Sequence, residues 1–302
     1  MTRNKRQERA ADAAGAEKQP PAAAKLLLRR RIIMGLLSFL LLVGVILLLY
    51  PTVSGLWNAY HQTKAVVSYV EQTEAMDEET RKALWEDAKA YNEALAQKET
   101  QSWTLTDEER EVYEKQLSVD IKGTMGYIEI PCINTLLPIY HGTSEAVLQE
   151  GVGHIEGSSL PVGGVGSHTV VSGHRGLPSA RLFTELERVK LDDVFYLHVL
   201  GETMAYKVDQ ILTVEPHEME ELKIQLGKDY CTLVTCTPYG INSHRLLVRG
   251  HRIDLAEAEA AAPTEEPRVN YAVFILASIG AQLVLLAVVV RMLRKNRRRK
   301  NT

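Results

Sequence analysis

Hydrophobic residues follow three different patterns along the chain. Two runs, 32–50 and 271–290, are almost continuously apolar and contain no charged residue. At about 1.5 Å of rise per residue, a helix over the first run would span roughly 28 Å, close to the hydrocarbon thickness of a bilayer. The pattern therefore predicts two transmembrane helices that flank a single domain.

Basic residues flank both predicted spans. Three arginines occupy 29–31, and seven Lys or Arg residues lie between 291 and 302. Lys and Arg concentrate on the cytoplasmic side of membrane helices. The cytoplasmic tails are therefore expected to be 1–31 and 291–302, with the domain between the spans outside the cell membrane. A cleaved signal peptide is the alternative for the first run, but its apolar core is long and Tyr50-Pro51 offers no small-x-small cleavage site.

Between the spans the pattern changes from helical to extended. Leu84, Ala88, Tyr91 and Leu95 have the i, i+4, i+7, i+11 spacing of an amphipathic helix, so 51–124 is expected to be a helical region. Beyond it, short apolar or alternating runs are separated by turn signals. The expected strands are Gly126–Ile130, Leu136–Tyr140, His168–Ser172, Val194–Val199, Tyr206–Thr213, Tyr230–Thr235 and Arg245–Ile253.

Many short strands at this spacing indicate a mainly β fold, a small closed barrel over 125–255. Short helices are expected over 181–189 and 218–226, and 256–270 is expected to be a linker to the second span. Thr106 to Glu109 fits a helix capping box.

Charge is distributed unevenly. The whole chain carries −3, but the two basic tails carry +6 and +7, which leaves −16 for 32–290. Membrane topology and anionic lipid headgroups account for the basic tails, so nucleic-acid binding is not indicated. The acidic domain would favour a cationic partner, such as a protein surface presenting lysine, although acidity mostly serves solubility.

Cys236 is the candidate nucleophile. It stands at the end of a β-branched run, where Pro238 and Gly240 then stop the strand. The alternative is a small buried hydrophobic residue, which is what most free cysteines are. The chain has three cysteines, and Cys231 lies an odd number of residues from Cys236, so their side chains should point to opposite faces of the strand without forming a disulfide. No Cys/His spacing fits zinc.

His174 and Arg245 are the candidate partners of this thiol. His174 sits in a glycine-flanked turn after a strand, and an imidazole can act as a base near neutral pH. Arg245 begins the strand after the Cys236 loop, where its guanidinium could stabilise an oxyanion. A solvated strand-end charge is the alternative for Arg245. Arg249, on the same face, is its strongest competitor, and Arg175 is a weaker one.

Three segments carry a specific resemblance. Thr232 to Cys236 reads T-L-V-T-C, which resembles the T-L-x-T-C signature of the sortases, the transpeptidases of Gram-positive cell surfaces. Ser172 to Gly176 resembles their histidine motif, and Asn242 to Leu246 their arginine motif. The similarity covers roughly 125–253. Two spans that flank the domain look like class C, the pilin-polymerising sortases.

The resemblance implies an eight-stranded sortase-type barrel and a cysteine transpeptidase reaction. Cys236 would attack the Thr–Gly carbonyl of an L-P-x-T-G-like signal to give a thioester, His174 would act as base and acid, and Arg245 would hold the oxyanion. Thr235 would bind substrate. A pilin lysine would resolve the thioester, and no metal or organic cofactor is required.

One feature departs from class C. Those sortases often cover their active site with a lid that carries an Asp-Pro-aromatic motif, and this chain has no Asp-Pro pair. Trp103 lies in the expected place, where it would either cover the thiol or serve as ordinary helix packing.

Three other functions stay open from the sequence. A sortase that anchors proteins to the cell-wall precursor would differ only in using a peptidoglycan amine as acceptor. A surface protein that is itself a sortase substrate would need L-P-x-T-G before the second span, where the chain reads A-P-T-E-E-P. A cysteine peptidase would release its product to water.

Overall fold

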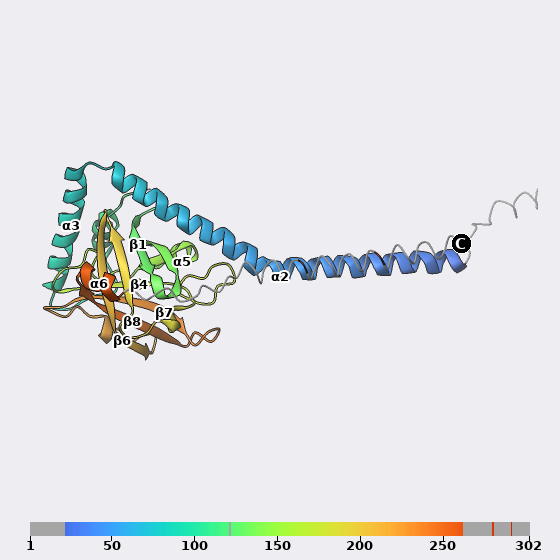
Figure 1. Ribbon diagram of the computed structural model, residues 1–302. Coiled ribbons are helices and arrows are strands. Elements are labelled where there is room, and N and C mark those ends of the chain that lie inside the picture. The colour runs from blue at the N-terminus through green and yellow to red at the C-terminus, as the bar shows by residue number, and fades with distance from the viewer. Residues whose placement is uncertain (1–21, 121, 262–279, 281–290, 292–302) are drawn as a thin grey trace, which may run out of the picture. The chain divides into compact units, whose positions relative to one another are not determined.

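The computed structural model describes residues 22–120 and 122–261, together with Gly280 and Arg291. The described residues up to Ala258 form one compact unit, in which eight strands close into a barrel in the order β1-β2-β3-β4-β7-β8-β6-β5. Helices precede the barrel along the chain (Figure 1). The closed eight-stranded barrel is confirmed.

The strands and helices have these bounds. The helices are α2 (Ala22–Ala75), α3 (Glu78–Ala96), α4 (Asp107–Lys115), α5 (Glu145–Glu150) and α6 (Leu255–Ala261). The strands are β1 (Thr124–Ile130), β2 (Thr135–His141), β3 (Val152–His154), β4 (Ser167–Ser172), β5 (Val194–Val199), β6 (Glu202–Val214), β7 (Asp229–Thr237) and β8 (His244–Ile253).

Most neighbouring strands are antiparallel, but β2 pairs with β3 and β4 pairs with β7 in parallel. The β4–β7 pair places the chain after β4 beside the end of β7. The β7–β8 pair is antiparallel, so the end of β7 meets the start of β8. The chain after β4 therefore comes together with the β7–β8 connection, more than 60 residues later in the sequence, at one end of the sheet.

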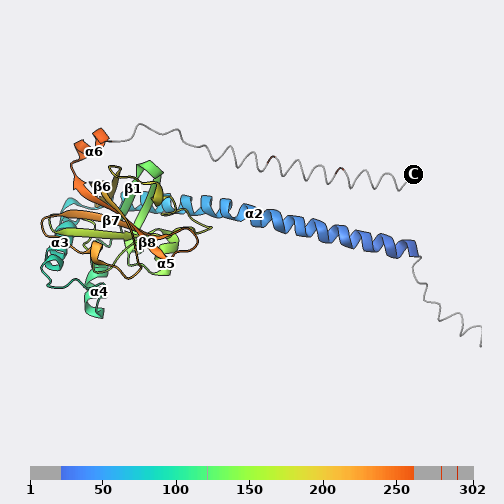
Figure 2. The same ribbon diagram turned by 90° about the horizontal axis from the view of Figure 1, so that it is seen from below.

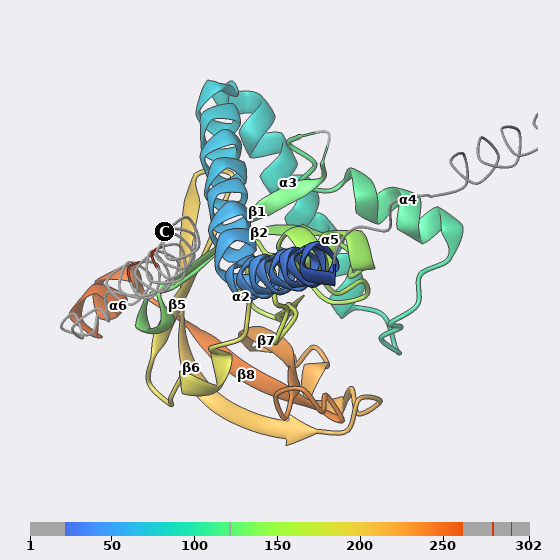
Figure 3. The ribbon, with the colours of Figure 1, turned by 90° about the vertical axis from the view of Figure 1, so that its right-hand side faces the viewer.

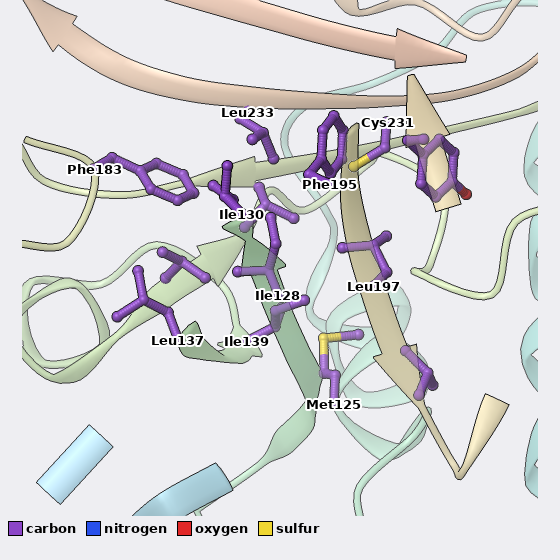
Figure 4. Packing of buried hydrophobic residues seen from close by; sticks show 14 of the residues in the cluster. Met125, Ile128, Ile130, Leu137, Ile139, Phe183, Phe195, Leu197, Cys231 and Leu233 are labelled. Atoms are coloured by element: carbon purple, nitrogen blue, oxygen red, sulfur yellow. The ribbon is translucent and has the colours of Figure 1, made fainter. Parts of the chain in front are cut away.

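Alternation along the strands fills the barrel with apolar side chains. Figure 4 shows Ile128 and Ile130 of β1, Phe195 of β5, and Cys231 and Leu233 of β7 pointing toward one another in the core. All five are essentially inaccessible to solvent. Burial raises the pKa of the Cys231 thiol well above its usual value, so this cysteine is a core residue.

Each of the three N-terminal helices is held to the barrel by one buried polar side chain. From α2, Tyr69 Oη donates to the carbonyl of Met125 at 3.0 Å. From α3, Asn92 pairs with both backbone groups of Leu160, at 2.7 and 3.0 Å. From α4, Tyr113 Oη lies 2.9 Å from His154 Nδ1. These bonds fix the helices more specifically than apolar contact alone, because a buried polar group left unpaired is costly.

The helices surround part of the barrel. Figure 3 shows α2 beside β1 and β2, with β6 and β8 on the other side of the barrel. Figure 2 shows α3 and α4 away from the first half of α2. The Thr106–Glu109 capping box at the start of α4 is confirmed.

Helix α2 differs from the expectation of a span that ends at Tyr50. It continues without interruption through Pro51 to Ala75, so the predicted span and the first predicted soluble helix are one element. Within the described part of the chain, this is the one helix long and apolar enough to cross a membrane. The second predicted span, 271–290, lies outside the described residues apart from Gly280, and the predicted tails lie largely outside them.

Several short elements also differ from the sequence prediction. The predicted helix over 181–189 is a set of turns with a 3-10 helix at Leu186–Arg188, and the one over 218–226 reduces to a 3-10 turn at Glu220–Leu222. The first residues of the predicted linker form α6. Strand β3 and helix α5 were not predicted, because three residues containing a glycine, and six residues of helix, are too short to show a period.

Candidate active site

Strand register brings Cys236 and Arg245 together. They are directly paired positions across β7 and β8, so their side chains leave the same face of the sheet. Leu233 and Cys231, at odd spacings from Cys236, point into the barrel core. The face that carries Cys236 and Arg245 is therefore the outer face.

The parallel pairing of β4 with β7 brings His174 to the same level. Ser172 pairs with Val234, and the amide of Gly173 donates to the Val234 carbonyl at 3.0 Å. His174 follows the end of β4 by two residues, and Cys236 follows Val234 by two. The same end of the sheet therefore carries His174, Cys236 and Arg245.

Two contacts fix the turn that presents His174. Thr235 Oγ1 donates to the carbonyl of Gly173 at 2.7 Å, and the amide of Phe183 donates to the carbonyl of His174 at 3.1 Å. A Cβ at residue 173 would lie 2.8 Å from the Phe183 ring, so the close approach requires glycine. The sequence suggested that the glycines beside His174 expose its ring. Gly173 therefore also allows the turn to pack against Phe183.

Thr235 faces inward, unlike Cys236. Its side chain is buried, and the hydroxyl is engaged by the Gly173 carbonyl. The contact that the structure shows is therefore with the loop that leads to His174. A direct contact of Thr235 with a bound peptide stays a prediction.

A carboxylate that the sequence did not suggest lies next to His174. Glu145, the first residue of α5, places Oε2 3.5 Å from His174 Nε2. The pKa of Glu145 is lowered, first by the amide of Gln149, which donates to Oε1 at 2.6 Å, and then by the neighbouring His174. No sequence signal links α5 to the histidine motif, since only the fold brings them together.

The competing arginines are engaged elsewhere. Arg249 forms two hydrogen bonds with Asp209, at 2.9 and 3.1 Å, and stacks over the ring of Tyr230. Arg175 is buried, pairs with Glu187 and donates to Thr237 Oγ1 at 3.0 Å. Arg245 contacts only backbone carbonyls, at 3.1 and 3.4 Å, and pairs with no carboxylate among the described residues. Arg245 is therefore the arginine free to bind a substrate oxygen.

The buried histidines are structural. His154 and His168 are fully enclosed, and burial lowers the pKa of each to about 4. His168 bridges the carbonyl of Lys223 and the hydroxyl of Thr232, at 3.0 and 2.7 Å. Both rings are thus neutral at physiological pH and hold loops in place.

An apolar cluster adjoins the three candidate residues on the outer face. Val234 and Leu247, each two residues from Cys236 or Arg245, pack with Val170 and Leu222. Trp103, from the non-helical segment between α3 and α4, lies against this cluster. Trp103 therefore packs on the outer face of the sheet, and its covering of the Cys236 thiol stays a prediction.

The Trp103 segment is fastened on both sides. Gln101 donates from Nε2 to the carbonyl of Gly157 at 2.8 Å and accepts from the amide of Ile224 at 2.9 Å. Gly157 has a left-handed φ of 82°, and a Cβ there would clash with the carbonyl oxygen of Ser102. We call residues 100–105 the strap.

Two surface cavities lie away from these residues. One, of about 720 Å³, is lined by Asp209, Asp229 and Arg252 near the opposite end of β7. The other, of about 440 Å³, lies between α2 and the barrel. Among the described residues, no group of three or more His, Cys, Asp or Glu side chains could hold a metal ion.

Comparison with known proteins agrees with this geometry. Residues 128–253 match the family model of the sortase domain. The structure of sortase C1 from Streptococcus agalactiae is 52% identical and superimposes with a TM-score of 0.62 over 63% of this chain and 98% of that one. The chain belongs to the sortase family, in class C.

Two further class C structures are similar. Sortase C of Streptococcus pneumoniae is 46% identical, with a TM-score of 0.56 over 63% of this chain and 97% of that one. Sortase C of Clostridium perfringens, solved with its C-terminal cell wall sorting motif, is 46% identical, with a TM-score of 0.57 over 64% of this chain and 99% of that one. Among curated relatives, sortase A of Bacillus anthracis is 29% identical, and this chain spans 61% of its length.

Proposed function

We propose that this sortase is a membrane-anchored cysteine transpeptidase that joins pilins. Its substrate would be an L-P-x-T-G-like sorting signal, cleaved between Thr and Gly. The observation that carries the proposal is the register that pairs Cys236 with Arg245 and brings the end of β4, which His174 follows, beside β7. A nucleophile, an acid–base group and an oxyanion donor in a row are what acyl transfer needs.

In the first half-reaction, the Cys236 thiolate attacks the threonine carbonyl carbon. A C–S bond forms, and the carbonyl oxygen becomes an oxyanion to which the Arg245 guanidinium donates. When the C–N bond breaks, the glycine amine leaves with a proton from His174. The product is a thioester between Cys236 and the threonine.

In the second half-reaction, a lysine ε-amine from the next pilin attacks the thioester. His174 takes a proton from the amine, the C–S bond breaks, and the thiolate of Cys236 is restored. The new bond is an isopeptide. Glu145 Oε2 lies 3.5 Å from His174 Nε2, where the carboxylate would help to orient the imidazole ring.

The similar proteins support the substrate class. The Clostridium perfringens sortase C was solved with a cell wall sorting motif, and the Streptococcus pneumoniae structure is described in terms of pilin substrate specificity. The alignment with this chain covers nearly the whole length of each of these two proteins. The same classes of donor and acceptor are therefore proposed here.

The strap would act as a lid. Trp103 occupies the apolar cluster next to Cys236, where the side chains of an extended peptide would have to lie. Its anchor is Gln101 rather than an Asp-Pro pair. A sorting signal would therefore have to displace the indole before reaching the thiol.

The apolar half of α2 would anchor the enzyme. The proposed topology has two spans, at 32–50 and 271–290, with both termini in the cytoplasm and the catalytic domain outside. Support comes from the apolar composition of α2 and from the basic residues that flank both runs.

The experiment that tests this function separates the acceptors. The purified full chain is incubated with a sorting-signal peptide alone, with a lysine-presenting pilin domain, and with a peptidoglycan stem peptide. An isopeptide product with the pilin lysine supports the proposal, with Cys236→Ala as the inactive control. Exclusive transfer to the stem peptide would identify a cell-wall anchoring sortase, and exclusive hydrolysis a peptidase.

A further inference from the structure

The loop that follows His174 is bonded to the helix that leaves the predicted membrane span. Asn58 Nδ2 donates to the carbonyl of Ser179 at 2.7 Å, and Ser54 Oγ donates to the carbonyl of Pro178 at 3.4 Å. Both donors belong to α2, which runs without a break from the apolar segment. The position of the bilayer along α2 therefore sets the position of this loop.

The spacing along α2 places the loop close to the membrane. The predicted span ends at Tyr50, so Ser54 and Asn58 lie four and eight residues beyond it. At 1.5 Å of rise per residue these are roughly 6 and 12 Å from the hydrocarbon boundary, and less if the helix tilts. Ser54 thus falls within the headgroup layer, which is about 5–7 Å thick on each side of the hydrocarbon, and Asn58 lies just beyond that layer.

A second loop of the active site lies against the first. The Arg175 guanidinium sits over the ring of Tyr239 at 5.8 Å, and a Cβ at Gly176 would lie 3.1 Å from the same ring. Tyr239 belongs to the β7–β8 loop, which connects Cys236 to Arg245. Tyr239 and Ile241 in this loop are 61% and 72% exposed. Two apolar side chains thus project from the catalytic end of the barrel, beside the loop bound to α2.

Helix α2 carries an exposed apolar face at the same level. Val53, Leu56, Trp57 and Tyr60 have the i, i+3, i+4, i+7 spacing of one helix face, and all are more than 60% exposed. A different set of α2 side chains, Asn58, Gln62 and Tyr69, donates hydrogen bonds to the carbonyls of Ser179, Glu150 and Met125. Trp and Tyr concentrate at membrane interfaces, where a ring with one polar atom suits the headgroup layer.

We propose that the catalytic end of the barrel docks on the bilayer surface. The docking surface consists of the α2 face Val53, Leu56, Trp57 and Tyr60 together with Tyr239 and Ile241 of the β7–β8 loop. Its partner is the outer lipid leaflet, because the α2 face directly continues the apolar segment of the same helix. This inference rests on the proposed membrane anchoring.

The docking has a consequence for catalysis. Cys236 and Arg245 flank the docked loop, so acyl transfer would take place next to the headgroups. A substrate tethered to the same membrane would present its signal at that height, whereas a soluble peptide would gain nothing from it. Docking would therefore favour membrane-tethered donors without altering the chemistry at Cys236.

The test places a fluorophore on the loop of the full chain in phospholipid nanodiscs. Ile241→Cys in a Cys236→Ala background is labelled with bimane, and Cys236→Ala alone gives the background from the remaining cysteines. The matched control is Leu226→Cys, since Leu226 is 81% exposed and precedes β7. It precedes the opposite end of that nine-residue strand, whose first residue, Asp229, lies roughly 23 Å from Cys236 by strand rise.

Quenching by headgroup nitroxide lipids should be at least twofold stronger at position 241 than at 226. Equal quenching would overturn the proposal. Protection of position 241 from both lipid and aqueous quenchers would also overturn it, because a protein segment would then cover the loop. These readings do not depend on catalysis, since the labelled chains lack the thiol.

A second arm measures turnover of the chain with Cys236 intact. Ile241→Ser should lower cleavage of a bilayer-tethered sorting signal at least fivefold and leave cleavage of the soluble peptide unchanged, whereas Leu226→Ser should change neither. An equal effect of Ile241→Ser on both substrates would contradict docking. Failure of the unaltered chain to cleave either substrate would instead refute the proposed function.

Discussion

Cys236 and Arg245 occupy paired positions across β7 and β8, so the thiol and the guanidinium leave the same face of the sheet. Eight residues lie between them along the chain, and the loop within this stretch contains Pro238 and Gly240. Their spacing is fixed by sheet hydrogen bonds rather than by the loop. An oxyanion donor held in this way needs no reorganisation when the tetrahedral intermediate forms.

Replacing this guanidinium should damage catalysis far more than stability. Arg245→Ala is expected to lower kcat/KM for the sorting peptide by about 100- to 1000-fold, the usual cost of losing an oxyanion donor. Arg245→Lys should recover only part of the activity, because an ammonium lacks the planar fork. Kinetics with the peptide substrate measure both.

Arg249→Ala is the matched control for this prediction. Arg249 lies on the same strand face, but its guanidinium is paired with Asp209. Its loss should lower the free energy of unfolding by about 1 kcal/mol and leave kcat/KM within a few-fold of the original. A large kinetic defect in Arg249→Ala, with normal activity in Arg245→Ala, would reverse the assignment.

Thr235 is expected to position the histidine loop. Thr235→Val keeps the shape of the side chain but leaves the Gly173 carbonyl without its donor, which costs about 1–3 kcal/mol. We expect kcat to fall about tenfold with KM nearly unchanged, because His174 is displaced while the peptide face remains. Thr235→Ser retains the hydroxyl and should restore kcat. A rise in KM alone would indicate direct substrate contact instead.

Removal of the Trp103 indole should open the face beside Cys236. Trp103→Ala is expected to raise the rate of soluble peptide cleavage about tenfold while lowering the free energy of unfolding by about 2 kcal/mol. Trp85, on α3, packs against the main core cluster and provides the control. Trp85→Ala should destabilise similarly without accelerating cleavage, and equal acceleration would refute the lid.

The stability of the barrel should fall as the solution becomes acidic. The pKa values of His154 and His168 are lowered by burial to about 4, below the value of about 6.5 in an unfolded chain. Between these values the unfolded state binds more protons, so stability is full above pH 6.5 and is lost as the pH falls toward 4. Each histidine can contribute up to about 3 kcal/mol.

Urea unfolding at pH 7.5 and pH 5.0 measures this effect. The free energy of unfolding should decrease by about 1–3 kcal/mol per buried histidine. His168→Asn should reduce the difference between the two pH values, and His217→Asn, an exposed control, should not. Unchanged stability across this range would contradict the burial of neutral rings.

Much of the barrel could be predicted from residue patterns. Val194–Val199 was predicted with the observed bounds, and Thr106 was identified as a helix cap, because both depend on local alternation and capping chemistry. Helix α2 could not be predicted in full. Pro51 favours a break, and only the packing of residues beyond it on the barrel keeps the helix continuous.

Only part of the candidate site could be predicted. The sequence identified Cys236, His174 and Arg245 and placed them at strand ends. Their alignment could not be predicted, because it depends on the parallel pairing of β4 with β7. The sequence also did not predict the place of Glu145 beside His174 or that of Trp103 against the outer face, because α5 and the strap reach these positions only through tertiary contacts.

Peptide-mapping mass spectrometry tests most directly whether Cys236 is the acyl acceptor. The full chain is mixed with a sorting-signal peptide without an amine acceptor, quenched in acid and digested. We predict that the peptide acyl group, ending in threonine, is attached to Cys236, accumulates in the unaltered chain and is absent from Cys236→Ala. Attachment at Cys132 or Cys231, or peptide cleavage that persists in Cys236→Ala, would contradict the account.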